Sequence, residues 1–174
     1  MKKYLFFGAL LYSVSAAFPV SSFADTRTVT IRSEAAIPNI FELTISKSGQ
    51  SELAFGSIVS SGTPTKVGPI TIVVSVSSNT GVPYQIIQFL NGPLENANGD
   101  KIGQENLQFI TSSAKSTGTV ITTPLAGSVS PETIYVSNET GASDTISAQY
   151  WLTPPSFQPP GSYSTLLTYT ASAL

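Results

Sequence analysis

Tyr163-Ser164-Thr165-Leu166-Leu167-Thr168-Tyr169-Thr170-Ala171-Ser172-Ala173 is the stretch that decides the fold. It follows the turn-forming Pro159-Pro160-Gly161, and Leu166 alone interrupts its two-residue alternation. The apolar or nearly apolar positions are Tyr163, Thr165, Leu167, Tyr169, Ala171 and Ala173. This period predicts one long β-strand with a buried face. A domain that closes on such a strand leaves an edge open, and we expect a neighbouring strand to fill it.

The first 24 residues have the features of an export signal. Lys2 and Lys3 precede an apolar run over residues 4–12, and Ser22-Phe23-Ala24 offers a small-x-small cleavage site before Asp25. The run is shorter than the roughly 18 residues that a spanning helix needs. We therefore expect residues 1–24 to be removed, with no membrane-spanning segment left in the mature chain; an N-terminal anchor is the alternative.

The composition of residues 25–174 suits one exported domain with a core of its own. Six basic side chains remain after Lys2 and Lys3 are set aside, against ten acidic ones, so the basic footprint of a nucleic-acid-binding protein is missing. The chain has no cysteine, so no disulfide can staple it. Stability must come from packing and strand pairing.

Short alternating segments separated by turn residues run through the whole chain. The closing stretch is preceded by expected strands at residues 26–37, 40–46, 53–59, 70–77, 84–90, 107–111, 119–123, 133–136 and 145–152. Residues 95–106 are ambiguous but lack a helical apolar stripe. Nine or ten short strands without a helix predict an all-β sandwich of immunoglobulin-like type.

Residues suited to catalysis are scarce. With no histidine or cysteine, the usual general base, thiol nucleophiles and most zinc sites are excluded. The acidic side chains are scattered, and the segment Glu95–Asp100 lacks the spacing of an EF-hand, so an Asn98-Gly99 turn explains it better. Asn138-Glu139-Thr140 fits a glycosylation sequon but is interpreted as a plain loop, and Trp151 as packing rather than a carbohydrate platform. We predict no enzyme activity, cofactor or metal.

Three stretches together resemble a known family. They are Leu53-Ala54-Phe55-Gly56-Ser57, the strand at residues 70–77 with its continuation Ser78-Asn79-Thr80-Gly81-Val82-Pro83-Tyr84, and the closing Gly161-Ser162-Tyr163-Ser164 with Leu167-Thr168-Tyr169. In this order they resemble secreted pilins of the spore coat protein U type and, more broadly, archaic chaperone–usher fimbrial subunits. Many of those subunits carry a cysteine pair that this chain lacks.

The resemblance implies an immunoglobulin-like domain, residues 38–174, that lacks its final strand. The gap is filled by the N-terminal extension of the next subunit, a form of strand addition. Residues 25–37 fit that donor role, with Val29, Ile31, Ser33, Ala35 and Ile37 on one face. The acceptor edge would be Tyr163, Thr165, Leu167, Tyr169 and Ala171. The alternative is that residues 25–37 pair within their own chain.

The implied partners are other copies or related subunits, a periplasmic chaperone and an outer-membrane usher. The implied location is a fimbria at the cell surface, reached through the periplasm. A different class of function remains open, because Tyr163–Tyr169 also resembles the closing motif of cell-wall-binding WxL domains, with Tyr169 where those domains have Trp. On that interpretation the chain is a monomeric module bound to cell wall or glycan.

Overall fold

The computed structural model describes residues 37–46, 53–59 and 62–174, and residues 37–174 form one compact unit. The predicted signal peptide and nearly all of the predicted donor segment lie outside the described residues. The described chain is almost entirely β-structure, with a single 3-10 turn, η1 (Gln104–Asn106). The strands are β1 (Phe41–Ser46), β2 (Leu53–Ile58), β3 (Val67–Ser78), β4 (Tyr84–Leu90), β5 (Leu94–Glu95), β6 (Lys101–Ile102), β7 (Leu107–Ser113), β8 (Thr119–Val120), β9 (Leu125–Ala126), β10 (Glu132–Val136), β11 (Asp144–Leu152), β12 (Gly161–Thr165) and β13 (Leu167–Ala173).

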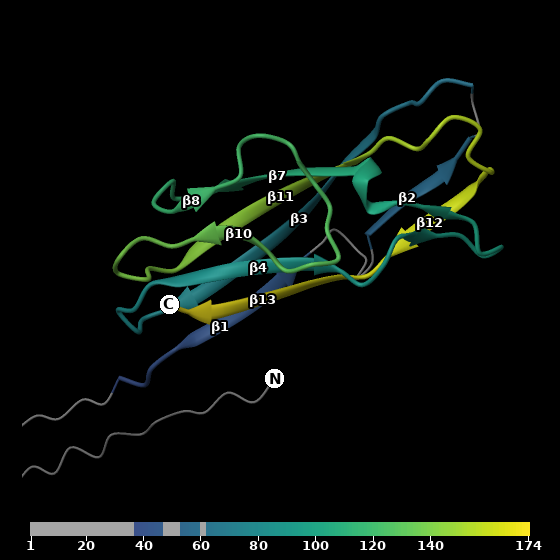
Figure 1. Ribbon diagram of the computed structural model, residues 1–174. Helices are drawn as coiled ribbons and strands as arrows, with labels where there is room; N and C mark the ends of the chain where they lie inside the picture. Colours follow the sequence, from purple (N-terminus) through teal and green to yellow (C-terminus); the bar gives the residue numbers. More distant parts are fainter. Residues whose placement is uncertain (1–36, 47–52, 60–61) are drawn as a thin grey trace, which may run out of the picture. The chain divides into compact units, whose positions relative to one another are not determined.

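These strands form three antiparallel sheets, drawn in Figure 1. The first has the order β1-β3-β11-β7-β9, the second β13-β4-β10-β8 and the third β2-β12-β5-β6. Buried and partly exposed residues alternate strictly along β4 and β11, as expected for strands with one face in the core. The core includes residues of all three sheets. Between the first two, Thr111 of β7 donates to the Ile134 carbonyl of β10, and the hydroxyls of Tyr150 and Tyr169 meet.

The strand order of the first sheet, and one strand pair of the second, match an immunoglobulin sandwich. In that fold the first sheet runs A-B-E-D and the second contains C, F and G. Here β1-β3-β11-β7 reproduces the first order, and β4 and β13 take the places of C and F. No strand among the described residues takes the place of G beside β13. The all-β sandwich predicted from the alternating segments is confirmed.

The closing stretch differs from its prediction, because it is two strands rather than one. It breaks at Leu166, which is 57% exposed and lies between β12 in the third sheet and β13 in the second. The inward face is nevertheless kept across the break, since Tyr163, Thr165 and Tyr169 are all buried. A twisted strand passing from one sheet to the next must bend somewhere, and it bends at the one residue that breaks the alternation.

The ambiguous segment at residues 95–106 contains a tight turn between β5 and β6. The Asn96 side-chain oxygen accepts the backbone N–H groups of Asn98 (3.0 Å) and Asp100 (2.9 Å). Gly99 adopts a φ of +86°, which favours glycine. The turn at Asn98-Gly99 is thus confirmed.

One margin of the sandwich is closed by residues 119–127, named here the closed margin. β8 pairs with β10 of the second sheet, and β9 pairs with β7 of the first. Between them, Thr111 N–H donates to the Ile121 carbonyl (2.7 Å), and Ile121 N–H donates to Thr111 Oγ1 (2.8 Å). The chain itself therefore crosses from one sheet to the other along this side.

Candidate functional site

The opposite margin, formed by β1 and β13, is the candidate site. Among the described strands, β1 is the terminal strand of the first sheet and pairs only with β3, and β13 is the terminal strand of the second and pairs only with β4. Both lie along the lower border of the view in Figure 1. We name the inward-facing residues of these two strands the open margin; they are Phe41, Leu43, Ile45, Leu167, Tyr169, Ala171 and Ala173.

The β1 side of the open margin is apolar, inward-facing and poorly covered. Leu43 and Ile45 stand opposite Val76 and Val74, which are fully buried, so all four point toward the core. Ile45 is nevertheless 48% exposed and Phe41 41%. The Phe41 ring meets Tyr84 edge-on at a centroid distance of 5.7 Å. Side chains aimed at the core of a closed sandwich would be buried, so no element among the described residues covers these.

The β13 side is anchored by a buried hydroxyl cluster. Tyr169 lies opposite Gln88, and its hydroxyl is 2.7 Å from that of Tyr150, which in turn donates to the Gln88 side chain. Burial raises the pKa of both phenols above the usual value, so they remain protonated and serve as hydrogen-bonding groups. Farther along β13, Ala171 and Ala173 face the buried Ile86 and Tyr84 but offer little volume.

The free edge of β13 begins just past the pair formed by Thr165 of β12 and Leu53, the first residue of β2. One edge of residues 164–167 is occupied by the segment 90–95, through the pairs Leu167–Leu90 and Ser164–Glu95. The other edge of β12 carries β2, from Gly161 opposite Ile58 to Thr165 opposite Leu53. Beyond Leu166, none of the described strands pairs with the seven residues of β13 on that side.

The predicted acceptor edge is therefore narrower in the structure. Leu167, Tyr169 and Ala171 lie on the unpaired edge of β13. Tyr163 and Thr165 do not, because β12 has neighbours on both sides; their buried side chains instead form hydrogen bonds, Tyr163 to the Pro159 carbonyl and Thr165 to the Gly92 carbonyl. Local alternation could not reveal this, since it says nothing about which edge is already paired.

The predicted donor residues are placed only at one end. Ile37 is described, lies outside any strand and is 82% exposed. Val29, Ile31, Ser33 and Ala35 lie outside the described residues. The β1 residues Phe41, Leu43 and Ile45 were missed as site residues, although their period-2 spacing in an expected strand was a usable signal.

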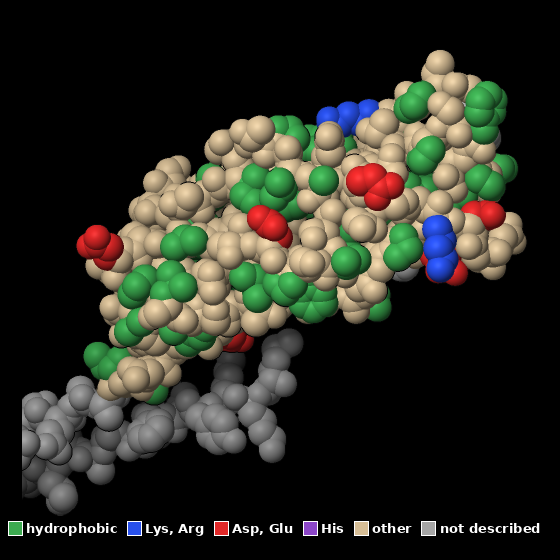
Figure 2. Space-filling view, viewed as in Figure 1, with side chains coloured by type: hydrophobic (Ala, Val, Ile, Leu, Met, Phe, Trp, Pro, Cys, Tyr) green, Lys and Arg blue, Asp and Glu red, His purple; other side chains and the backbone are tan. Residues whose placement is uncertain are grey.

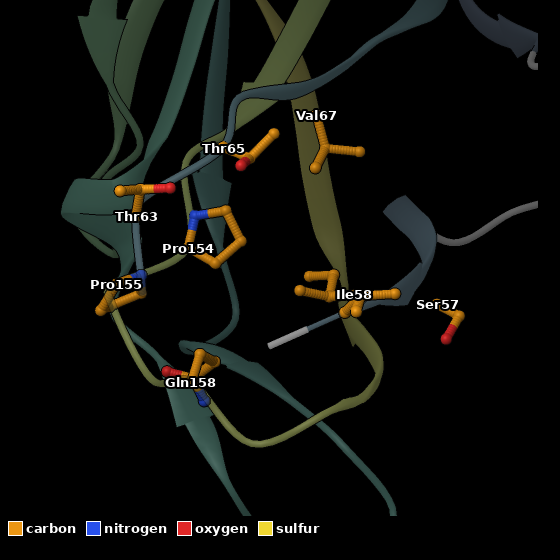
Figure 3. A pocket seen from close by; sticks show the side chains of 9 residues that line it. Ser57, Ile58, Thr63, Thr65, Val67, Pro154, Pro155 and Gln158 are labelled. Atoms are coloured by element: carbon orange, nitrogen blue, oxygen red, sulfur yellow. The ribbon is translucent and has the colours of Figure 1, made fainter. Parts of the chain in front are cut away.

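A hollow of about 240 Å³ lies at the C-terminal end of β2, beside Ile58. Figure 3 shows Pro154 and Pro155 opposite Ile58, with Thr63, Thr65 and Gln158 around them. None of the described residues that line it is titratable. Gln158 is committed to structure, since its amide donates to the Lys101 carbonyl and the Tyr163 hydroxyl. The described lining residues therefore include no carboxylate, imidazole or amine that could act as a general base for the hydroxyls of Ser57 and Thr65.

Two other places considered for ligand binding, Trp151 and the segment 95–100, are engaged in contacts within the chain. Lys66 lies 4.6 Å from the ring centroid of Trp151, so a cation–π contact takes up one face of the only tryptophan. Asn96 Nδ2 donates to Asp100 Oδ2 (2.9 Å), which closes the turn in the segment 95–100 on itself. Within the described ranges no group of three or more His, Cys, Asp or Glu side chains could hold a metal. Figure 2 shows few charged side chains on the face it displays, and basic and acidic ones lie side by side at its right-hand end.

One buried carboxylate was missed by the sequence reasoning. Asp144, 3% exposed, accepts hydrogen bonds from the hydroxyls of Ser113 and Tyr135 and from the backbone of Lys115 and Thr145. Burial opposes its ionisation, but these hydrogen bonds outweigh burial and lower the pKa of Asp144. The cluster joins β7, β10 and β11, so its role is to tie the two sheets together.

Comparison with known proteins adds no assignment. No protein-family model matches the chain, and no curated protein matches it. Along the described residues, no helix has the length and apolar character needed to cross a membrane. The open margin is therefore the feature of the described chain that bears most directly on function.

Proposed function

We propose that this protein is a structural subunit of an extracellular fimbria-like polymer, in which the open margin of one copy receives the N-terminal strand of the next. The observation that supports this most is the pair of facing terminal strands, β1 and β13, each hydrogen-bonded on one side only among the described residues. Their inward side chains include Phe41 and Ile45, which are more than 40% exposed. A strand added there occupies the G position of an immunoglobulin sandwich.

The segment 25–37 has the pattern that this position requires. It alternates, and one of its faces carries Val29 and Ile31. Burying a valine or isoleucine side chain contributes about 1.5–3 kcal/mol before the cost of ordering the segment. Each backbone hydrogen bond to β13 contributes roughly 0.5–1.5 kcal/mol more. Several such terms together are enough for a stable link between subunits.

The same margin supports the proposed assembly partners. An exposed strand edge beside apolar side chains promotes unwanted pairing with other chains. A subunit exported through the predicted signal at residues 1–24 therefore needs the edge covered until polymerisation. This need, together with the resemblance to fimbrial subunits, supports a periplasmic chaperone and an outer-membrane usher as partners and the cell surface as the destination.

A matched pair of substitutions tests the proposal. Ile31→Asp places a charge on the inward face of the donor strand, where it would be buried unpaired, whereas Thr30→Asp places the same charge on the outward face. On gels run without boiling, the wild-type protein and Thr30→Asp should give ladders, and Ile31→Asp should give a monomer. Wild-type protein that migrates only as a monomer would contradict the proposal and favour the monomeric wall- or glycan-binding module.

A further inference from the structure

The inward row of β13 changes in size halfway along the strand. Leu167 and Tyr169 are large, and they face the buried Leu90 and Gln88. The next two positions, Ala171 and Ala173, are small and face Ile86 and Tyr84. The poorly covered Phe41 contacts Tyr84, which pairs with Ala173, so uncovered apolar surface lies near the small end of the row.

The candidate donor segment has the same size pattern in its own direction. Val29 and Ile31 are large, and Ser33 and Ala35 are small. When two rows that both run from large to small are placed antiparallel, each large side chain stands opposite a small one. Packed protein interiors favour such alternation, because voids and overlaps are both destabilising.

We infer that residues 29–35 of one copy pair antiparallel with β13 of another, with Ser33 opposite Tyr169. This inference rests on the proposed function and specifies its register. The pairs are Val29–Ala173, Ile31–Ala171, Ser33–Tyr169 and Ala35–Leu167. Sliding the antiparallel strand by two residues either way sets two large side chains against each other, Ile31 against Tyr169 or Ile37 against Leu167.

Parallel pairing fails for a different reason. The parallel register that best matches the sizes sets Ser33 opposite Leu167 and Ile37 opposite Ala171. It draws Pro38 into the paired segment, where a proline has no N–H to donate. It also leaves Val29 and Ile31 outside the margin. Antiparallel pairing covers both of these large side chains.

The neighbour of β12 limits where the docked strand can end. β13 has seven residues, and in β12 the edge on the same side is occupied by β2. In this register Ile37 reaches Thr165, whose edge is already paired with Leu53 of β2. The docked strand must therefore leave the sheet after Ala35, shortly before Pro38. Ile37 does not enter the margin.

Cysteine cross-linking of the full chain tests this register, because the protein has no cysteine of its own. Thr170 is exposed on the outward face of β13, and the register sets Arg32 opposite it. Directly opposed Cα atoms lie about 4.5–5.5 Å apart, within reach of a disulfide, whereas diagonal neighbours two residues away lie about 7–8 Å apart. Arg32→Cys with Thr170→Cys should give a ladder that survives boiling without reductant. The controls Thr30→Cys and Glu34→Cys, each with Thr170→Cys, should give several-fold less.

A size exchange gives a second test that does not depend on disulfide geometry. Ala171→Leu should remove the unboiled ladder, because the larger side chain at this position would stand against Ile31 of the incoming strand. Adding Ile31→Ala should restore the ladder, which also shows that the Ala171→Leu chain folds. Failure of Ile31→Ala to restore the ladder would overturn the register.

The cross-linking outcomes separate the register from the proposed function. If copies cross-link at a control pair, the register is wrong but strand exchange between copies stands. The same holds if none of the three pairs cross-links while unboiled ladders persist. A cross-link within single chains, with no ladder for the wild-type protein, overturns both.

Discussion

The two margins of this sandwich carry similar apolar side chains but are covered very differently. At the closed margin, residues 119–127 cross between the sheets, and Phe109 and Tyr135 beneath them are at most 1% exposed. At the open margin no described residue spans from β1 to β13, and Phe41 is 41% exposed although it faces inward. Among the described residues, the chain therefore covers one side of the sandwich and not the other.

The largest loss of stability is expected from a substitution at the closed margin. Phe109 is fully buried, pairs with Leu125 of β9 and stacks on Tyr150 at a centroid distance of 5.6 Å. Phe109→Ala should lower the free energy of unfolding by about 3–5 kcal/mol, because it leaves a cavity in the core. This loss is measured by urea denaturation of the Ile31→Asp protein, in which the subunits stay apart. A loss below about 1 kcal/mol would show that this margin is not tightly packed.

A smaller effect concerns the buried carboxylate beside the closed margin. The lowered pKa of Asp144 means that its contribution to stability is present above the unfolded value of about 3.9 and is lost as the pH falls through the folded value. Asp144→Asn should cost about 1.5–3 kcal/mol near pH 7 and should remove this part of the acid dependence. Unfolding curves at several pH values, from strongly acidic to neutral, measure both, with the exposed Glu139→Gln as the control. An unchanged acid dependence in Asp144→Asn would contradict the role of this hydrogen-bonded cluster.

The smallest effect in the unassembled subunit is expected at the open margin. Phe41→Ala should cost only about 1 kcal/mol in the Ile31→Asp background, because much of the ring is already exposed. In assembled protein the same substitution should cost more, since the docked strand covers the ring there. Thermal unfolding of the two forms, each with and without Phe41→Ala, gives the difference. Equal losses in both forms would show that the incoming strand does not reach Phe41.

The periodicity of the chain predicted most of its longer strands, but not β5, β6 or β9. Alternation located β4 and β10 and the greater part of β3, β7 and β11, and it identified the inward faces. It also identified Leu167, Tyr169 and Ala171 as members of one inward row. These predictions succeeded because the faces of a strand are a local property, fixed by the pleat of the backbone.

Which edges are paired is not a local property, and only the tertiary structure decided it. Tyr163 and Tyr169 share one face in the sequence, yet β2 pairs beside Tyr163, while no described strand lies on that side of Tyr169. Asp144 gave no local sign that Ser113 and Tyr135, from two other strands, would surround it. Such contacts join residues far apart in the chain, so they follow from how the sheets pack, and alternation within one strand carries no information about them.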